Sequence, residues 1–583
     1  MKEIFKLNKE IRKGVEVHGE WNGNTCALTL VNRTENDVIL EDVCVFSAEN
    51  PFTPDTKFYG EGYNMLSQYG GTIKDFKLLG SYSDYDHYKF KRPLDMHQVY
   101  NMAIFYPEGQ KPLLVGFSSC NRFNGWIRFN ESKIEITLNG EGIALQRGQS
   151  IELEEVYVEQ GDYNSVLGNF AEAIAKNHPM REFCEIPTGW CSWLVYGPNV
   201  TAKNIYDNLD AIKKNGLDLK YIQIDDGYQE YWGDWFNFTD KFEGGVKKVC
   251  LDIKDKGFEP AIWVAPFVAE KSSRIFKNHP DWFIKDENGL PLSSGDVSFG
   301  GWRCAPWYIL DLTNPYALDY VKTVFSVMRR EWHIKYFKLD AIIWAAMPFG
   351  VRYDRTKTAV EAYKMGMQAI CEAVGKESFI LGGNSPMWPS IGYINAMRVT
   401  NDNCRSWYQF KQIAKECFPR NWQHNRLWIN DPDTVLLQNE RVKIMGPDGR
   451  MIYQEGSLTA DEFAFNAAYT VASGGMVLSG DDVSALTSEN IELLRRLLPP
   501  SRYAAEFENG DYSLGRARLS DEKTAYYIFN FEDAPMDLEI PVGGRVRVYD
   551  TIEDKDLGIF DNKIIMKGIR PHLGKILICK DVK

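Results

Sequence analysis

The sequence predicts a (β/α)8 barrel preceded by a large β-sandwich and followed by a small antiparallel β-domain. The chain has 583 residues, several times the ~150 residues of an average domain. Through its middle, eight short apolar segments mostly alternate with amphipathic helical segments, which is the pattern of a parallel barrel. On either side of this region, short strand-like runs follow one another without a long helical period.

Residues 1–180 predict the N-terminal β-sandwich domain. Runs such as CALTLVNR, PLLVGFSS and SIELEEVYV place β-branched residues between Gly, Asn and Asp turns. So many strands over this length favour a large sandwich. From Val166 to Lys176 the apolar residues instead recur at helical spacing, so we expect a helix that leads into the next domain.

Residues 181–500 predict the barrel. We expect its eight strands at 188–193, 221–227, 260–266, 335–341, 379–384, 396–402, 427–431 and 475–480. Helical patterns lie between most of them, as at 201–216, 313–332, 358–375 and 488–499. The fifth and sixth strands are joined by about a dozen residues, too few for a regular helical crossover, so this unit should be irregular. A doubly wound sheet is the alternative, but no GxGxxG and no P-loop follows a strand.

Residues 501–583 predict a C-terminal β-sheet domain. Short strand patterns return there in YSLGRARL, AYYIFNF, RVRVYDT and KILICK.

Composition and charge narrow the possible partners. The chain is 44% apolar and 25% charged, which is typical of globular proteins. It has 67 Lys and Arg against 80 Asp and Glu, with no dense basic run, so we expect no nucleic-acid partner. The charged N-terminus and the absence of any ~18-residue apolar stretch predict a cytoplasmic protein with no membrane partner. The 13% of aromatic residues is a weak indication of sugar binding, because rings cover the apolar face of a pyranose.

Cysteine and histidine usage gives no support for a metal or a cofactor. The 11 cysteines contain no CxxC pair, and the eight histidines never occur as HxxxH. We therefore expect neither a metal site nor a cofactor.

Acidic and aromatic residues gather at the expected C-terminal ends of the barrel strands, where barrel active sites lie. They are Trp190, Trp193, Asp225, Asp226, Trp263, Lys338, Asp340, Asn384, Arg398, Asp402, Asn430 and Asp431. Because side chains alternate along a strand, Lys338 shares a face with Asp340, and Arg398 shares one with Asp402. Each of these two carboxylates therefore has a cation on its own side.

Two carboxylates across a cleft can cleave a glycosidic bond through an oxocarbenium-like transition state. We expect Asp340 to have a pKa lowered by the Lys338 ammonium and to act as the nucleophile. Asp402 is the candidate general acid, which afterwards activates water. Asp225 and Asp226 are candidates to accept hydrogen bonds from sugar hydroxyls.

Each of these residues, taken alone, has a simpler structural interpretation. An Asp at a strand end is more often a helix cap or a turn residue, and this applies to Asp225, Asp226 and Asp402. Asp431 and Asp433, in the sequence NDPD, are interpreted mainly as a turn. Single tryptophans usually belong to the core. The functional interpretation gains weight because all the candidates fall on strand ends together.

The same segments resemble glycoside hydrolase family 36 of clan D, which consists largely of retaining α-galactosidases. The resemblance rests on GWCSW (189–193), YIQIDDGYQ (221–229), GFEPAIWVAPF (257–267), HPDW (279–282), ILDLTNP (309–315), KYFKLDA (335–341) and MRVTND (397–402). It covers Pro187 to about Asp482, roughly half of the chain. It implies an N-terminal supersandwich, a C-terminal sheet domain and exo-acting removal of terminal α-linked galactose. A small carbohydrate is then the partner, and a homo-oligomer is possible.

The resemblance also implies roles for single residues. Asp340 matches the nucleophile, Asp402 the acid/base, and Asp225 with Asp226 the pair that binds the axial 4-hydroxyl and the 6-hydroxyl. Sugar-contacting positions are matched by Trp193, Trp263, Lys338 and Arg398, with Asn384 as a further candidate. An aromatic residue of the N-terminal domain reaches the active site in this family, and Tyr59 or Tyr63 is the candidate here.

Two departures from the family pattern leave the substrate open. Many relatives have Cys where this chain has Gly383, and Tyr where it has Leu194. Both changes remove bulk or a hydroxyl near carbon 2 of the sugar. An α-N-acetylgalactosaminidase is therefore a serious alternative. A galactosyl-transferring transglycosylase and a catalytically inactive sugar-binding protein are less favoured, the latter because both catalytic positions hold Asp.

Overall fold

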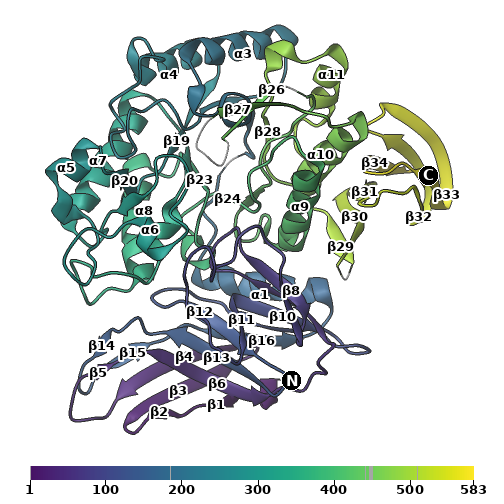
Figure 1. Ribbon diagram of the computed structural model, residues 1–583. Helices are drawn as coiled ribbons and strands as arrows, with labels where there is room; N and C mark the ends of the chain where they lie inside the picture. Colours follow the sequence, from purple (N-terminus) through teal and green to yellow (C-terminus); the bar gives the residue numbers. More distant parts are fainter. Residues whose placement is uncertain (1, 184, 440, 446–450, 509, 583) are drawn as a thin grey trace.

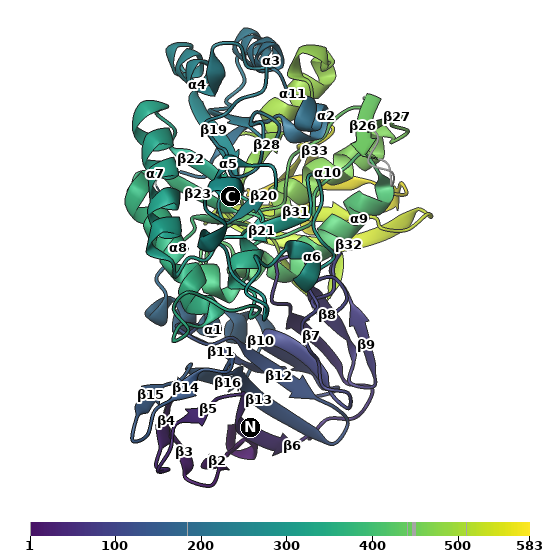
Figure 2. The ribbon, with the colours of Figure 1, turned by 60° about the vertical axis from the view of Figure 1, so that its left-hand side comes forward.

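The computed structural model describes residues 2–183, 185–439, 441–445, 451–508 and 510–582. A parallel barrel lies at the centre, with an N-terminal β-structure below it and a C-terminal sheet beside it (Figure 1). The N-terminal part still lies below the barrel after a turn of 60° (Figure 2). The predicted fold class is confirmed. The predicted domain boundaries, near residues 180 and 500, stay predictions.

The N-terminal part is one continuous antiparallel sheet of 14 strands. Apolar side chains from strands distant in the sheet, such as Leu30, Val45 and Val115, belong to one buried core. The sheet therefore curls around its own core, as a sandwich does. Its strands are β1 (Lys6–Leu7), β2 (Glu10–Arg12), β3 (Val15–Asn22), β4 (Thr25–Asn32), β6 (Asp42–Glu49), β7 (Lys57–Glu61), β8 (Gln68–Thr72), β9 (Asp75–Leu78), β10 (His97–Tyr106), β11 (Leu113–Phe117), β12 (Gly125–Phe129), β13 (Lys133–Asn139), β15 (Ser150–Glu152) and β16 (Val156–Gln160).

Two short elements complete this part. Strands β5 (Val38–Ile39) and β14 (Ala144–Leu145) form a separate ribbon. Helix α1 (Tyr163–Asn177) contains the predicted helical segment and lies between the sheet and the barrel (Figure 1).

All eight predicted barrel strands are present and run parallel in the order β25-β24-β23-β22-β19-β18-β17-β28. Val435, which follows β25, bridges Ser479 of β28 and closes the barrel. The strands are β17 (Thr188–Cys191), β18 (Tyr221–Ile224), β19 (Glu259–Val264), β22 (Tyr336–Leu339), β23 (Phe379–Gly382), β24 (Ala396–Arg398), β25 (Ile429–Asp431) and β28 (Val477–Ser479).

Helices surround the barrel as the pattern predicted. For example, α8 begins where the Thr358 hydroxyl and the Glu361 carboxylate cap each other's backbone amides. The irregular unit is confirmed, because only the 3-10 turn Trp388–Ser390 lies between β23 and β24. The helices are α2 (Trp193–Tyr196), α3 (Ala202–Asn215), α4 (Gly245–Asp255), α5 (Arg274–Asn278), α6 (Ser294–Val297), α7 (Pro315–Glu331), α8 (Ala359–Val374), α9 (Trp407–Cys417), α10 (Ala460–Ala472) and α11 (Ser488–Arg496). None of the described helices is long and apolar enough to span a membrane.

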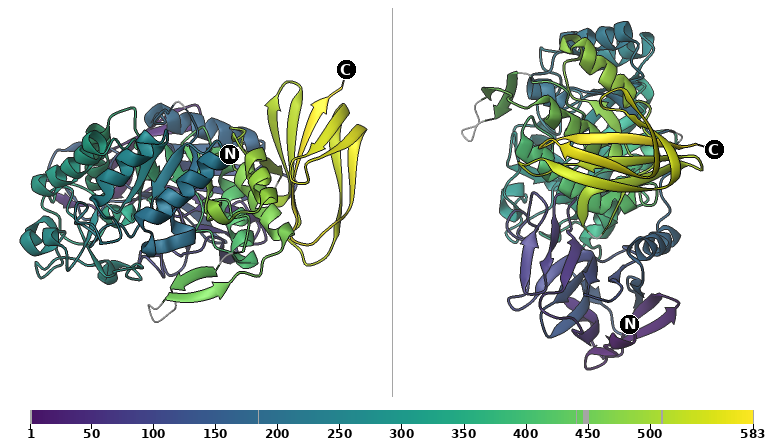
Figure 3. Two further views of the ribbon diagram at one scale, coloured as in Figure 1. Left: turned by 90° about the horizontal axis from the view of Figure 1, so that it is seen from above. Right: turned by 90° about the vertical axis from the view of Figure 1, so that its right-hand side faces the viewer.

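The remaining strands form small sheets outside the barrel. Two antiparallel pairs are β20 (Val268–Glu270) with β21 (Trp307–Ile309), and β26 (Arg441–Met445) with β27 (Met451–Glu455). The C-terminal sheet contains β29 (Glu506–Glu508), β30 (Asp511–Ser520), β31 (Lys523–Phe529), β32 (Met536–Asp550), β33 (Lys555–Ile569) and β34 (Gly574–Asp581). It stands against one side of the barrel (Figure 3).

The loop after β7 joins the N-terminal sheet to the barrel strand ends. The amide of Met65 donates to the carbonyl of Ser385, and that of Met387 donates to the carbonyl of Tyr63. Residues 62–67 are thereby held against the segment that follows β23. This contact brings part of the N-terminal sheet to the end of the barrel where the predicted site residues lie.

Candidate active site

A cavity of about 190 Å³ opens at the C-terminal ends of the barrel strands. Cavities that bind drug-sized ligands measure about 300–1,000 Å³, so this one suits a single sugar ring. All the residues with a predicted catalytic or sugar-binding role line it except Arg398, which lies behind Asp402. The other strand-end candidates, Trp190, Asn430 and Asp431, do not line it. Its lining residues are Met65, Leu66, Tyr82, Trp193, Asp225, Asp226, Trp263, Phe299, Trp302, Lys338, Asp340, Asn384, Asn401 and Asp402.

The Asp340 carboxylate directly follows β22 and is held by three donors. Trp263 Nε1 donates to its Oδ2 at 3.0 Å, and Asn384 Nδ2 donates to its Oδ1 at 2.8 Å. The amide of Ala341 also donates to Oδ1, at 2.7 Å. Oδ2 therefore has one hydrogen bond and a lone pair left to face the cavity, while Oδ1 is occupied.

The predicted lowering of the Asp340 pKa is wrong. Burial raises the pKa above its ordinary value, and this outweighs the opposing effects of Lys338, Asn384 and Trp263. The Lys338 ammonium makes its ion pair with Asp225 Oδ2, at 2.9 Å, rather than with Asp340. Alternation along the strand places Lys338 on the correct face, but the sequence cannot show which carboxylate it meets.

Asp225 and Asp226 follow β18, and each is paired with a cation. Besides Lys338, Asp225 Oδ2 accepts from Gln223 Nε2 at 2.7 Å. Arg303 donates to both oxygens of Asp226, at 2.5 and 2.7 Å, in a bidentate contact. Each of these carboxylates thus has a cationic partner, although almost no solvent reaches it.

Asp402 lies four residues after Arg398, which ends β24. Arg398 Nη1 donates to Asp402 Oδ1 at 2.7 Å, while 55% of the Asp402 side chain is exposed. Burial among the surrounding groups raises the pKa of Asp402, but the charges of Arg398 and Lys338 outweigh it and lower the pKa. In the empty cavity, Asp402 is therefore ionised at neutral pH.

Sequence reasoning missed several polar partners of these acids. Arg303, Gln229 and Trp232 all donate to Asp226. The interpretation of Asp431 and Asp433 mainly as turn residues was incomplete. The amide of Asp433 does donate to Asp431 Oδ1, but both carboxylates also contact the guanidinium of Arg398. Gln229 and Trp232 are close to Asp226 in the sequence, and Gln229 belongs to the YIQIDDGYQ motif, so these two could have been considered. Arg303 is 77 residues away, and only the fold brings it to Asp226.

Neither of the two candidates from the N-terminal domain, Tyr59 and Tyr63, reaches the cavity, but neighbouring residues of the same segment do. Tyr63 donates to the carbonyl of Ala346, and Tyr59 donates to Glu61, so both hydroxyls are used away from the cavity. Met65 and Leu66 of the same segment line the cavity instead, together with Tyr82. The Tyr82 ring stacks on Phe299 at a centroid distance of 5.5 Å, which forms an aromatic wall.

Two tryptophans of the GWCSW segment have different roles. Trp190 is completely buried and donates through Nε1 to the carbonyl of Asp481, so it belongs to the core, as the simpler interpretation expects. Trp193 lines the cavity with Asp402 and helps to lower the pKa of its carboxyl.

Gly383 lies beside the predicted nucleophile. A Cβ atom at this position would lie 3.5 Å from Asp340 Oδ1 and 3.3 Å from the carbonyl oxygen of Leu339. Neither Gly383 nor Leu194 is among the residues that line the cavity, so the argument about carbon 2 stays a prediction.

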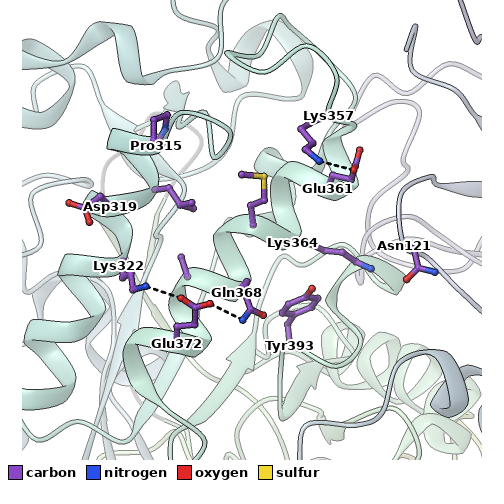
Figure 4. Close-up of a pocket in the computed structure, with 13 residues that line it drawn as sticks. Asn121, Pro315, Asp319, Lys322, Lys357, Glu361, Lys364, Gln368, Glu372 and Tyr393 are labelled. Atoms are coloured by element: carbon purple, nitrogen blue, oxygen red, sulfur yellow. Dashed lines mark hydrogen bonds and ion pairs between the residues drawn. The ribbon is translucent and has the colours of Figure 1, made fainter. Parts of the chain in front are cut away.

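A larger hollow of about 540 Å³ lies on the outside of the barrel, along α7 and α8 (Figure 4). Lys322 pairs with Glu372 at 2.8 Å, and Lys357 pairs with Glu361 at 3.2 Å. These side chains neutralise each other, and none of the predicted site residues lines the hollow. We therefore place the chemistry in the smaller cavity at the strand ends.

Comparisons with known proteins agree with this location. The Melibiase family profile matches residues 192–379, which span β18, β19 and β22 and end at the first residue of β23. The chain is 28% identical over 326 residues to the A type blood α-D-galactosamine galactosaminidase of Flavonifractor plautii. That match covers 50% of this chain and 29% of the relative, so the chain spans less than a third of that protein's length.

Solved structures match over more of the chain. The family 36 α-galactosidase AgaA of Geobacillus stearothermophilus superposes with a TM-score of 0.68, covering 97% of this chain and 81% of AgaA at 13% identity. The α-galactosidase of Thermus thermophilus, in complex with p-nitrophenyl α-D-galactopyranoside, gives a TM-score of 0.63 at 18% identity. It is covered to 96%, and this chain to 85%. The Melibiase match over part of the barrel and the shared three-part fold make the chain similar to the α-galactosidases of glycoside hydrolase family 36.

Proposed function

We propose that the protein is an exo-acting retaining glycoside hydrolase that removes terminal α-linked galactose by double displacement. Asp340 is the nucleophile and Asp402 is the acid/base. The observation that carries the proposal is that both carboxylates line one cavity of single-sugar size, together with the acid pair Asp225 and Asp226. This pair of carboxylates is the minimum that retaining cleavage requires.

In the first step, a lone pair of Asp340 Oδ2 attacks the anomeric carbon. The C–O bond to the leaving group breaks, and a proton from Asp402 passes to the leaving oxygen. Trp263 and Asn384 hold the carboxylate in the orientation for attack. The raised pKa of Asp340 makes its carboxylate a stronger base and nucleophile than a solvated one would be.

In the second step, the Asp402 carboxylate takes a proton from water as the water oxygen attacks the anomeric carbon. The bond to Asp340 breaks, and galactose leaves with the configuration it had in the substrate. Asp402 must therefore be protonated at the start of each cycle. A sugar hydroxyl that draws Arg398 Nη1 away from Asp402 would weaken the ion pair that now keeps this acid charged.

Hydrogen-bond capacity explains why the acid pair suits a sugar with two hydroxyls at this end. An ionised carboxylate offers about four acceptor positions. The protein fills most of them, but Asp225 Oδ1 accepts only from the amide of Asp226, and Asp226 Oδ2 only from Arg303 Nε. One acceptor position thus remains on each residue, which matches the 4-hydroxyl and 6-hydroxyl of galactose.

A second candidate function is favoured by Gly383. Gly383 does not line the cavity itself, but it carries no side chain beside Asp340, so we expect less obstruction to a 2-acetamido group than a cysteine would cause. An α-N-acetylgalactosaminidase would use the same two carboxylates. The galactosaminidase relative is a further reason to test this substrate.

A panel of p-nitrophenyl glycosides that differ only at carbon 2 tests the proposal. We expect the highest kcat/KM for the α-galactoside, with the β-galactoside and the α-glucoside inert. A large preference for the α-N-acetylgalactosaminide would replace the first function with the second. NMR of the first-formed sugar should show the α-anomer, and the β-anomer would exclude the double displacement.

A further inference from the structure

Three carboxylates converge on the guanidinium of Arg398. Asp402 Oδ1 lies 2.7 Å from Nη1, Asp433 Oδ1 lies 2.9 Å from Nη2, and Asp431 Oδ2 lies 3.4 Å from Nε. The side chains of Arg398 and Asp433 are each only 5% exposed. One cation therefore serves three anions, which leaves this group with an excess of negative charge.

Unlike Asp431, Asp433 contacts both the arginine that pairs with Asp402 and the residue that follows Asp402 in the chain. Its Oδ1 fixes the arginine that pairs with Asp402, and its Oδ2 accepts from the amide of Asn403 at 2.6 Å. Asn403 is the residue directly after Asp402. The side chain of Asn403 in turn donates to the carbonyl of Thr434, at 2.8 Å, so the two loops are joined at consecutive positions.

The backbone at Asp433 also indicates a specialised position. Its φ is +71°, in the left-handed region that residues other than glycine seldom adopt. Such a conformation costs free energy and persists where surrounding contacts require it. Here it directs the carboxylate toward Arg398 and Asn403.

We propose that Asp433 is a positioning residue for the acid/base Asp402: it holds Arg398 and Asn403 in place, and its negative charge favours the protonated form of Asp402. The inference rests on the proposed function. Asp433 touches neither the cavity nor a reacting atom, so its effect passes through its neighbours.

Charged and titratable groups reach Asp402 from several elements. Arg398 and Lys338 favour its ionised form. Asp340 and Asp433 are acids whose own pKa values respond to the charge of Asp402, and Tyr82 and Cys404 respond to it as well. Asp431 contacts the same guanidinium from β25. Asp433 is thus one of the anions that oppose the two cations.

The electrostatics of Asp433 support the same role. Burial raises its pKa to about 6, against the opposing effect of Arg398. Above that pH it is ionised and repels a charge on Asp402, and it competes with Asp402 for Arg398. Replacing it with a neutral residue removes both effects, and each of these losses lowers the pKa of Asp402.

The test compares Asp433→Asn with a matched control, Asp481→Asn. Asparagine tolerates a positive φ and keeps the shape of the side chain. Asp481 is also fully buried and pairs with an arginine, Arg405, at 2.5 Å, but it contacts neither Arg398 nor Asn403 in the described contacts. We expect Asp433→Asn to move the basic limb of kcat, which reports the substrate complex in which Asp402 is protonated, to lower pH by about one unit. Substrates with a poor leaving group should slow more than nitrophenyl galactoside, because they depend more on the acid.

A second readout does not depend on turnover. Trp193 lines the cavity with Asp402 and influences the pKa of its carboxyl. The ¹⁹F signal of 5-fluorotryptophan at this position, assigned with Trp193→Phe, therefore reports the ionisation of Asp402. The midpoint of this titration should fall in Asp433→Asn and stay unchanged in Asp481→Asn.

An unchanged midpoint in Asp433→Asn, or an equal change in the control, overturns the inference. If the wild-type protein cleaves none of the glycosides, the proposed function fails, and the ¹⁹F titration still decides whether Asp433 controls the charge of Asp402.

Discussion

At the scale of single residues, the environment of Asp340 decides whether it can act as a nucleophile. Three hydrogen bonds fix its carboxylate, and burial raises its pKa. It must be ionised to attack, so protonation at low pH should stop the reaction.

Replacing Asp340 with Asn should lower kcat by several orders of magnitude, because the amide cannot form the glycosyl intermediate. Binding of galactose, measured by calorimetry, should persist, since Asp225 and Asp226 remain. Asp319→Asn on the exposed side of α7 is the control and should behave as wild type. Unchanged turnover in Asp340→Asn would refute its role.

The acid limb of the kcat/KM profile should lie above the ordinary range of an aspartate, ~3.9, because the pKa of Asp340 is raised. Asn384→Gly removes one donor to the ionised carboxylate and suits the positive φ of 41° at this position. The acid limb should then move to higher pH by about one unit, since a hydrogen bond to a charged group contributes about 1.5–3 kcal/mol. A profile identical to that of the wild type would contradict this account of Asp340.

The sequence predicted which residues meet at the cavity, because strand ends of a barrel point to a common place. It failed on their partners. Lys338 pairs with Asp225 rather than Asp340 because the distance between neighbouring strands, and not alternation along one strand, decides the closest contact. Arg303 and Asp433 come from loops, for which the sequence has no periodic signal.

At the scale of elements, an ion pair joins the N-terminal sheet to the barrel. Arg420 Nη2 lies 2.7 Å from Glu61 Oε2, and neither side chain is exposed. Gln423 also donates to Glu61, at 2.8 Å. The same guanidinium donates to the carbonyls of Met65 and Ser67, which fixes the loop that brings Met65 to the cavity.

Glu61→Gln should lower the free energy of unfolding by about 3–5 kcal/mol, because it leaves the buried charge of Arg420 without its partner. The KM for galactosides should rise as well, since the loop that carries Met65 and Leu66 loses support. Glu539→Gln breaks an exposed ion pair with Lys563 and should cost no more than about 1 kcal/mol. Urea unfolding of both variants measures these losses. Equal losses of stability would contradict the claim that the buried Arg420–Glu61 pair matters more for stability than an exposed pair.

Helices and strands in which apolar residues repeat regularly were predictable from the sequence. Helices α3, α7, α8 and α11 lie within the expected ranges because their apolar residues repeat about every 3.6 residues. The barrel strands lie within one residue of theirs because they are short runs of apolar, often β-branched residues. The N-terminal strands were recognised, but not their pairing into one 14-stranded sheet. Pairing between strands distant in the chain depends on tertiary contacts, which local pattern does not encode.

At the scale of the whole molecule, two buried histidines make stability depend on pH. His178 Nε2 accepts from the amide of Cys120, at 3.0 Å, and His424 Nδ1 accepts from that of Asn430, at 3.1 Å. Burial lowers the pKa of each to about 4, from 6.5. Both are therefore neutral in the folded protein at neutral pH.

Folding stability should fall as the pH falls below about 6.5, because the two histidines bind protons in the unfolded chain but stay neutral in the folded protein. The loss is complete near pH 4 and amounts to about 3 kcal/mol for each histidine. His178→Gln keeps an acceptor but cannot titrate, so its unfolding midpoint in urea should depend less on pH between 7 and 4.5. An unchanged pH dependence would contradict the assignment.

The presence of an N-terminal β-part, a barrel and a C-terminal sheet could be predicted from the chain length and from the alternation of strand and helix patterns. How these parts pack against one another could not. The sequence placed an N-terminal aromatic at the active site through the wrong residues, because Tyr59 and Tyr63 point into other contacts. Which residue of an interdomain loop reaches a cavity depends on how two domains pack, and this is a property of the assembled molecule.

The most direct test of the account is covalent labelling with a 5-fluoro-α-D-galactosyl fluoride, which lets a retaining enzyme form its intermediate but slows the second step. Mass spectrometry should show one fluorogalactosyl group added to the intact protein, located after digestion on the peptide that contains Asp340. A label on another residue, or no label in a preparation that turns over α-galactosides, would contradict the assignment of Asp340 as the nucleophile.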